Sequence, residues 1–442
     1  MKPYPRYNQS SARWYSSFPE NWSEVKAKRL FSNERERASS EDEQLAASQK
    51  YGVIPQALMM TQNNAKVTLA LKGTDNFKQV KENDFVISLR SFEGGIEHSK
   101  YNGCISPAYT VLRLQHESSY PNYFRYALKC SPFIQALNST SEGIRDGKTI
   151  TYDEFGELLV VLPSQAEQKT IATFLDRETQ RIDSLIEEKQ TFIKLLKEKR
   201  QALISHVVTK GLNPDVQMQD SGIEWIGQVP KHWSTLQLGK VTLSKCDGPF
   251  GSGLKSSHYT DSGVRVIRLQ NIKSGYFAQG KDAYIDKEYY ANNLRNHDVL
   301  EGDLLLAGLG DPKNPVGRAC VAPPGIEPAM VKADCFRFRL DSHKVTAEFV
   351  AYQLTAGANY DSGILSTGAT RSRIPLMTMA TRKIAICPIE EQKAIVVVLE
   401  KKLDKLERLI KETSTSINLL HERRTSLISA AVTGKIDVRE AV

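Results

Sequence analysis

Two long stretches of the chain carry apolar residues at alternating spacings of four and three positions. This alternation is typical of a coiled-coil seam, so each stretch is predicted to be a long helix with one apolar stripe. Both stripes are interrupted at the same place, at Lys189 and Thr413, and both carry an arginine at a later seam position, Arg200 and Arg424. The predicted seam residues are Leu175, Ile182, Ile186, Ile193, Leu196 and Leu203 in the first helix, and Leu399, Leu403, Leu406, Ile410, Ile417, Leu420 and Leu427 in the second.

The helical segments are predicted at residues 163–211 and 388–435. Neither seam contains a proline or an internal glycine. The first helix is expected to stop at Lys210-Gly211 and the second near Gly434, because glycine commonly follows the last helical residue.

The sequence around the helices is duplicated. Glu167-Gln168-Lys169 returns as Glu391-Gln392-Lys393, and the match continues through both helices without a gap. Upstream, the segment from Trp14 to Trp22 matches the segment from Trp225 to Trp233, and these four residues are all the tryptophans of the chain. Each half is therefore predicted to contain a short lead-in segment, a globular domain and a long helix.

An apolar stripe on a single helix needs a partner, and the other copy in the same chain is the nearest candidate. An antiparallel pair lets one compact domain connect the end of the first helix to the start of the second. The expected result is a pseudo-twofold rod with a globular domain at each end. About 37 paired residues at 1.5 Å per residue would give a rod of about 55 Å, on the order of 16 base pairs of DNA.

The globular domains are predicted at residues 1–162 and 212–387, and residues 436–442 form a tail. Both domains mix short β-type runs, turns and a few helical stretches, so the predicted fold class is α+β. The clearest expected strands are Asp84–Leu89, Val264–Leu269, Asp303–Ala307 and Cys335–Leu340.

Composition narrows the class of protein. The 442 residues are 40% hydrophobic and 25% charged, which excludes a disordered or collagen-like chain. The net charge of +8 permits a polyanionic partner. The polar start of the chain is unlike a secretory signal, and the absence of a run of about 18 apolar residues predicts no membrane span. The six cysteines include no Cys-x-x-Cys pair, so we expect buried thiols in a reducing cytoplasm and no metal site.

Two loops are candidates for contact with a nucleic-acid backbone or with bases. The glycine-rich loop Gly248–His258 contains Lys255, Ser256 and His258, but its spacing does not fit a nucleotide-binding phosphate loop. Two interpretations of this loop stay open: it contacts a DNA backbone, or it is a surface turn with no binding role. The loop Thr367–Arg373 carries Thr370, Arg371 and Arg373, and arginine can bind guanine with two hydrogen bonds.

Further candidates are less specific. In the first domain, Arg145 and Lys148 lie in the segment comparable to the Thr367–Arg373 loop. Arg265 and Arg268 lie on or next to an expected strand, where either could be structural. No catalytic pattern was found: Asn314-Pro315-Val316 lacks the second proline and the aromatic residue of a methyltransferase N-P-P-[FYW] motif.

At this point the chain resembles the specificity subunit of Type I restriction-modification systems. The resemblance rests on the lead-in segment Asp220–Trp233 and on the strand-like segments Val264–Ile272 and Gly302-Asp303-Leu304-Leu305. It also rests on the start of both long helices, where a proline is followed within a few residues by Glu-Gln, in Pro163–Gln168 and Pro388–Gln392. It covers nearly the whole chain.

The resemblance implies two target recognition domains separated by an antiparallel two-helix coiled coil. Each domain would read one half of a bipartite site in double-stranded DNA, and the helices would set the gap. It also implies two modification subunits that methylate adenine with S-adenosylmethionine, and two restriction subunits that use ATP and Mg²⁺. The chain itself would bind no cofactor and catalyse no reaction.

Two other classes of protein stay open at this level. One is a stand-alone DNA methyltransferase or nuclease with an unrecognised site. The other is a scaffold between proteins that does not contact DNA.

Overall fold

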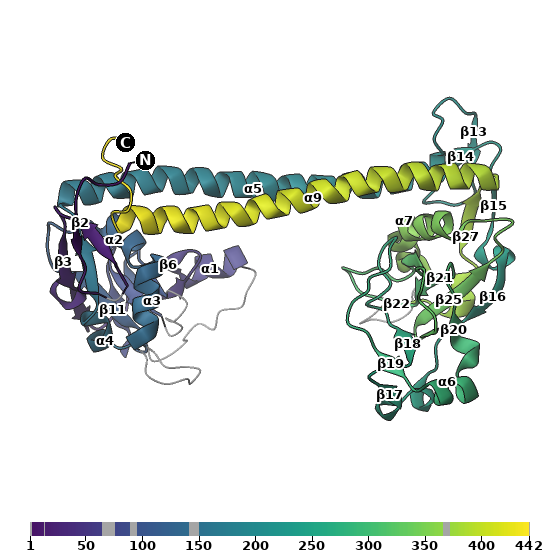
Figure 1. The fold of residues 1–442 in the computed structure, drawn as a ribbon, viewed down its shortest axis with the longest axis horizontal. Coiled ribbons are helices and arrows are strands. Elements are labelled where there is room, and N and C mark those ends of the chain that lie inside the picture. Colours follow the sequence, from purple (N-terminus) through teal and green to yellow (C-terminus); the bar gives the residue numbers. More distant parts are fainter. Residues whose placement is uncertain are drawn as a thin grey trace. The chain divides into compact units, whose positions relative to one another are not determined.

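The structure is a computed structural model, and it describes residues 2–12, 14–63, 76–88, 95–140, 150–365 and 372–441. The chain divides into two compact units. Unit 1 contains Met1–Gln190 and Ser414–Val442, and unit 2 contains Thr191–Thr413. Helices α5 (Gln165–Lys210) and α9 (Ile389–Val432) each contribute one part to each unit (Figure 1).

The described residues of unit 1 form short strands, shorter helices and one end of each long helix. Its strands are β1 (Tyr7–Gln9), β2 (Ser17–Pro19), β3 (Ser23–Lys26), β4 (Phe31–Glu34), β5 (Leu45–Ser48), β6 (Gly52–Pro55), β7 (Lys78–Val80), β8 (Phe85–Ile87), β9 (Ile96–His98), β10 (Gly103–Ile105), β11 (Thr110–Leu114) and β12 (Leu159–Leu162). Its shorter helices are α1 (Gln56–Asn63), α2 (Pro121–Ala127), α3 (Ser131–Thr140) and α4 (Tyr152–Gly156).

Several of the strands described in unit 2 are only two residues long. The described strands of unit 2 are β13 (Met218–Asp220), β14 (Gln228–Pro230), β15 (Ser234–Gln237), β16 (Thr242–Cys246), β17 (Tyr259–Thr260), β18 (Val264–Ile267), β19 (Tyr284–Ile285), β20 (Asp298–Val299), β21 (Leu304–Ala307), β22 (Leu309–Gly310), β23 (Ala319–Val321), β24 (Ala329–Val331), β25 (Cys335–Leu340), β26 (Ser372–Arg373) and β27 (Lys383–Ile386). Its shorter helices are α6 (Lys287–Asn293), α7 (Ala347–Leu365) and α8 (Leu376–Ala380).

The two units repeat one sheet. Unit 1 has the antiparallel order β4-β11-β8-β9, and unit 2 has the antiparallel order β16-β25-β21-β23. The strand after each lead-in segment pairs with the strand before each long helix, as β3 with β12 and β15 with β27. Unit 2 adds a second sheet, β17-β19-β18-β24-β20. The predicted class, α+β with an internal repeat, is confirmed.

A duplicated ion pair fixes the repeated sheet. In unit 1, Arg113 on β11 donates from Nε and Nη2 to both oxygens of buried Asp84, at 2.8 and 2.7 Å. In unit 2, Arg339 on β25 donates in the same way to Asp303, at 2.9 and 2.8 Å. The residue before Asp303 is Gly302 at φ 80°, and glycine suits this left-handed turn. The aspartates after the turns therefore join neighbouring strands in both units.

The antiparallel pairing of the long helices is visible within each unit separately. In unit 1, Leu175 near the start of α5 shares a core with Ile428 and Val432 near the end of α9. In unit 2, Val208 near the end of α5 shares a core with Leu399 near the start of α9. The predicted antiparallel pair is therefore confirmed, and α5 ends at Lys210 as the Lys210-Gly211 stop predicted.

The predicted seam residues all lie on the less accessible side of their helices. The buried ones are Leu175, Ile182, Ile186, Leu196, Leu399, Leu403 and Leu406. The half-buried ones are Ile193, Leu203, Ile410, Ile417, Leu420 and Leu427. In unit 1 the seam arginine Arg424 also donates from Nε to Asp183 Oδ1 on α5, at 2.9 Å.

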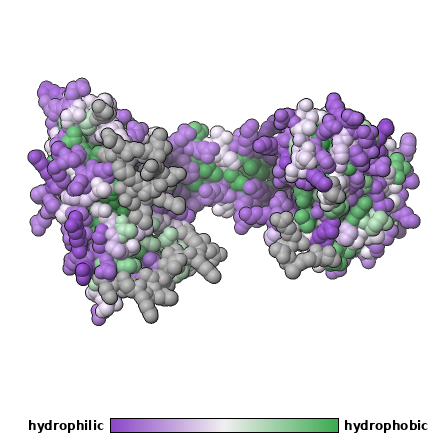
Figure 2. Space-filling model, turned by 90° about the horizontal axis from the view of Figure 1, so that it is seen from below, coloured by the Kyte–Doolittle hydropathy of each residue, from purple (hydrophilic) through white to green (hydrophobic). Residues whose placement is uncertain are grey.

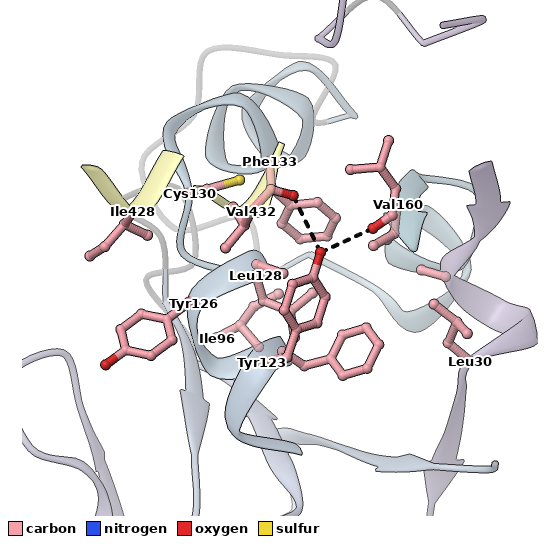
Figure 3. Close-up of a cluster of buried hydrophobic side chains, with 14 of the residues drawn as sticks. Leu30, Ile96, Tyr123, Tyr126, Leu128, Cys130, Phe133, Val160, Ile428 and Val432 are labelled. Atoms are coloured by element: carbon pink, nitrogen blue, oxygen red, sulfur yellow. Dashed lines mark hydrogen bonds between the residues drawn. The ribbon is translucent and has the colours of Figure 1, made fainter. Parts of the chain in front are cut away.

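One buried polar side chain joins the globular domain to the helices in each unit. In unit 1, the hydroxyl of Tyr123 donates to the carbonyl oxygens of Val161 and Val432, both at 3.3 Å (Figure 3). In unit 2, the Gln353 amide donates to the carbonyl oxygens of Ala385 and Val208, at 3.0 and 2.7 Å. These bonds fix each domain on its own part of the helix pair.

The glutamate and glutamine at the start of each long helix have repeated roles. Gln168 Oε1 accepts from the Tyr120 N–H at 2.8 Å, and Gln392 Oε1 accepts from the Thr346 N–H at 2.9 Å. Glu391 accepts from Trp233 Nε1 at 3.2 Å, which attaches the second lead-in segment to α9. The repeated Glu-Gln pair is thus explained by hydrogen bonds that hold the lead-in segment and the domain on the helix start.

The N-terminal arm and the C-terminal tail of unit 1 pack together (Figure 1). The Asp437 N–H donates to the Lys2 carbonyl oxygen at 2.8 Å, and the Tyr7 hydroxyl donates to the Gly434 carbonyl oxygen at 2.9 Å. Among the described helices, none combines the length and the apolar character needed to span a lipid bilayer.

Candidate nucleic-acid interface

The loop after β16 is held against the segment that connects β24 to β25. A Cβ on Gly248 would lie 2.1 Å from the Lys332 carbonyl carbon, so only glycine permits this approach. Asp247 Oδ1 accepts from the N–H groups of Gly248 and Asp334, at 2.7 and 3.0 Å. Burial raises the pKa of Asp247 to about 6, against the opposing effect of these hydrogen bonds. The loop therefore starts from a fixed, partly desolvated carboxyl group.

The polar residues predicted in this loop lie at its far end. Lys255 and Ser256 are exposed, and the Lys255 N–H donates to His258 Nδ1 at 3.2 Å. The imidazole of His258 lies on the ring of Tyr289, with 3.9 Å between centroids. Tyr289 in turn donates its hydroxyl proton to the Gly253 carbonyl oxygen at 2.8 Å. The loop is thereby shaped so that the side chains of Lys255 and Ser256 project to solvent.

Arg373 lies on the same surface as this loop. It is in β26, which pairs with β22, and its side chain is 45% exposed. Its guanidinium carbon lies 5.3 Å from the ring centroid of Phe250, and Nε donates to Asp334 Oδ1 at 2.8 Å. An arginine held on an aromatic face keeps part of its hydrogen-bonding edge available for a phosphate or a base.

Arg265 and Arg268 are used inside unit 2. Arg265 Nη2 donates to Asp282 Oδ1 at 2.6 Å and to Gln279 Oε1 at 2.9 Å, and its side chain is only 15% exposed. Arg268 Nη2 donates to the carbonyl oxygen of Lys281. Of the two interpretations left open by the sequence, these contacts favour the structural one, in which both arginines hold the segment before β19.

Four of the predicted residues cannot be placed. Thr370 and Arg371, and likewise Arg145 and Lys148 in unit 1, lie outside the described residues. The structure therefore brings together Lys255, Ser256, His258 and Arg373, by way of Phe250 and the loop between them.

Several residues of this surface were not predicted from the sequence. Phe250 is 50% exposed, and Lys332 Nζ lies 5.9 Å from the ring centroid of Tyr259 at the end of the loop. Pairs of an exposed aromatic ring and a basic side chain are common in sites that bind nucleic-acid backbones and bases. The pattern could have been found only for Phe250, which lies within the predicted glycine-rich loop, because Lys332 is far away in the sequence.

Among the residues that the structure describes, no group of three or more histidine, cysteine, aspartate or glutamate side chains is arranged to hold a metal ion. The six cysteines are free thiols, and burial raises the pKa of Cys320 and of Cys387 to about 12.

Comparisons with known proteins find similarity to specificity subunits of type I restriction enzymes. A family described as "Type I restriction modification DNA specificity domain" matches residues 19–195. The StySPI specificity subunit of a type I restriction enzyme from Salmonella potsdam is 24% identical over 330 residues, which cover 72% of this chain and 65% of that protein. The putative MjaX specificity subunit from Methanocaldococcus jannaschii is 25% identical over 335 residues, which cover 76% of this chain and 69% of that protein. The chain thus spans less than two thirds of the length of the first relative.

Two solved structures share the fold. A chain from a study of the assembly and conformational transition of a type I R-M system aligns with a TM-score of 0.72 at 14% identity, over 95% of this chain and 99% of that one. The HsdS subunit from Thermoanaerobacter tengcongensis aligns with a TM-score of 0.57 at 15% identity, over 97% of this chain and 100% of that one. The repeated sheet and the antiparallel long helices are therefore the fold that the chain shares with these two solved structures.

Proposed function

We propose that this chain is the non-catalytic, sequence-specific DNA-binding subunit of a type I restriction-modification complex. Each globular domain reads one half of a bipartite target in double-stranded DNA. The observation that carries the proposal is the duplication: each unit has the same sheet, the same Arg-Asp ion pair, and a domain side chain that donates to carbonyl oxygens at corresponding positions of the repeat. Unit 1 contains the start of α5 and the end of α9, and unit 2 contains the end of α5 and the start of α9.

The long helices set the gap between the half-sites and bind the modification subunits. These two roles are supported by apolar residues of the long helices that lie away from the seam and are exposed to water. In unit 1, Leu185 is 37% and Leu419 is 59% exposed, and in unit 2, Phe192 is 45% and Leu195 is 55% exposed. Figure 2 shows hydrophobic surface on the long helices. Exposed apolar side chains of this kind mark protein–protein contacts.

The partners then supply the chemistry. Two modification subunits bind S-adenosylmethionine and methylate adenine, and two restriction subunits use ATP and Mg²⁺ to move along DNA and cut it. This chain binds none of these cofactors. The complex acts in the cytoplasm, which agrees with six free thiols. The relatives, described as specificity subunits of type I restriction enzymes, support this assignment.

The proposal is tested by sequencing DNA methylation in a host with and without this chain, while the modification subunits are kept. One bipartite adenine motif should disappear when the chain is removed. In parallel, hydroxyl-radical footprinting of the purified chain on that motif should show two protected segments with an accessible gap.

Two results would contradict the proposal. One is a single, uninterrupted footprint, or methylation that does not depend on the chain. The other is methyl transfer or DNA cleavage by the purified chain alone with S-adenosylmethionine or Mg²⁺, which would indicate a stand-alone methyltransferase or nuclease.

A further inference from the structure

Unit 1 contains a basic cavity whose lining includes none of the candidate DNA-contact residues placed above. It has a volume of about 420 Å³ and lies where the globular domain meets α9. Its basic lining comes from four elements: Lys50 in the β5–β6 turn, Lys100 after β9, Arg125 and Lys129 around the end of α2, and Arg424 on α9. A cavity of about 760 Å³ adjoins it, because both are lined by Lys100 and Arg125.

Three of the five cations are held in place by carboxylates. Lys129 Nζ lies 2.5 Å from Oε2 of buried Glu97, and Arg424 Nε lies 2.9 Å from Asp183 Oδ1. Arg125 is paired with Asp176, and its Nε is buried without an acceptor among the described residues. These ion pairs stiffen the walls of the cavity and leave their cations partly neutralised.

The other two cations, Lys50 and Lys100, are exposed and form no ion pair with a carboxylate in the described part of the chain. Lys50 Nζ lies 4.9 Å from the ring centroid of Tyr51, and Tyr51 also lines the cavity. The cavity therefore has at its edge an aromatic side chain and two ammonium groups that form no ion pair among the described residues.

The turn that carries Lys50 is held rigidly. Gly52 has φ 79°, and a Cβ there would lie 2.7 Å from the His98 carbonyl oxygen. The next residue, Val53, forms a β-bridge with Ser99, directly before Lys100. The two lysines are therefore carried by segments that are joined to each other, which keeps their positions related without any bound ligand.

We propose that this cavity receives phosphates of the DNA backbone next to the half-site read by the first domain. The inference rests on the proposed function, since it assumes that unit 1 binds DNA. Ammonium groups that form no ion pair suit a phosphodiester, and contact with phosphates fixes the protein on the duplex without reading sequence. Because α9 forms one wall, the contact would also fix the duplex relative to the helix that sets the gap.

The test uses the full chain and the double variant Lys50→Ala with Lys100→Ala. Binding of a duplex with the bipartite motif and of a scrambled duplex is measured across salt concentrations. Both should weaken by the same factor, about tenfold near 0.1 M salt, and the slope of log K against log salt should fall by about 1.8, or 0.9 for each lost contact. The matched control is Lys2→Ala with Lys169→Ala, which removes the same charge from exposed sites of unit 1 outside the cavity. It should change the slope much less.

A second measurement locates the contact. Neutral methylphosphonates, placed one at a time along the motif, should weaken binding of the unaltered chain at one or two positions. The double variant should be insensitive at those same positions, and Lys50→Arg with Lys100→Arg should regain sensitivity. An unchanged slope, or equal sensitivity of both proteins at every position, would overturn the inference.

A small free phosphate is the competing occupant of the cavity. Calorimetric binding of inorganic phosphate or pyrophosphate, lost in the double variant while DNA binding is unaffected, would assign the cavity to such a ligand and refute the DNA contact. If the unaltered chain binds motif and scrambled duplexes equally, the proposed function fails. The difference in salt slope between the unaltered chain and the double variant still shows whether Lys50 and Lys100 contact phosphates.

Discussion

The partly buried carboxyl group of Asp247 allows a pH-dependent prediction for the Asp247→Asn variant. In the folded chain, burial raises the pKa of this group to about 6 from its ordinary value near 3.8. The folded state therefore holds the proton more tightly than the unfolded state, and this group's contribution to stability is lost as the pH rises from about 4 to 6. Above pH 7 the folded chain carries the full cost of keeping a partly buried carboxylate.

The size of this cost follows from the shift. A difference of about two pKa units corresponds to about 3 kcal/mol. Asp247 is only half-buried, so screening by solvent reduces the expected value to about 1 kcal/mol. Asparagine keeps a carbonyl oxygen for the N–H groups of Gly248 and Asp334, at 2.7 and 3.0 Å in the unaltered chain, and it carries no charge. The variant should therefore be more stable than the unaltered chain by about 1 kcal/mol at pH 8.

The assay is calorimetric unfolding of both proteins at pH 8 and pH 4. The advantage of Asp247→Asn should be present at pH 8 and should disappear at pH 4, where the carboxyl group is largely protonated in the folded chain. Asp261→Asn, a change at an exposed aspartate of unit 2, serves as the control. A variant that is equally stabilised at both pH values, or destabilised at pH 8, would refute the argument that burial governs this group.

Three further changes test the repeat, the DNA surface and the helices. Asp303→Asn should lower the free energy of unfolding of unit 2 by about 2 kcal/mol, because it weakens two charge-assisted hydrogen bonds from Arg339. Calorimetry should then show unit 2 unfolding at a lower temperature than it does in the unaltered chain. Arg371→Ala with Arg373→Ala should alter recognition of one half-site only, measured by selection from randomised duplexes, whereas equal loss on unrelated sequences would indicate phosphate contact. Deleting one heptad from each long helix, residues 187–193 and 411–417, removes about 10 Å and should shorten the methylated motif's gap by up to about 3 base pairs. An unchanged gap would show that the helices do not set it.

The long helices and the duplication could be predicted because their causes are local or repeated. The seam of α9, with Leu399, Leu403 and Leu406, is a periodicity visible in the sequence, and Gly211 marks the end of α5. By contrast, two-residue strands such as β17 and β20 exist only because a partner strand lies beside them. Their sequences contain no periodic pattern that could have revealed them.

The roles of the arginines could not be predicted for the same reason. The sequence offered Arg373 as a DNA contact and left open whether Arg265 is structural. In the structure Arg265 has Asp282 and Gln279 beside it, while Arg373 pairs with Asp334 and also lies on exposed Phe250. Whether an arginine is free to bind DNA is decided by which acceptors folding brings next to it. For Arg265 the carboxylate is seventeen residues away, and for Arg373 the aromatic partner is in a different loop.

The parts that the two units share are structural, and the parts that differ carry the candidate DNA contacts. The shared contacts, such as those of the buried residues Gln168 and Gln392 at the helix starts, are hydrogen bonds between a domain and its helix. The glycine-rich loop and Arg373 belong to unit 2, where a second sheet has been added, and the basic cavity with Lys50 belongs to unit 1, where β5 and β6 form an extra hairpin. Since the repeated fold carries a different candidate surface in each unit, the two half-sites are expected to differ in sequence. The bipartite target should then be asymmetric, unlike the palindrome that two identical domains would require.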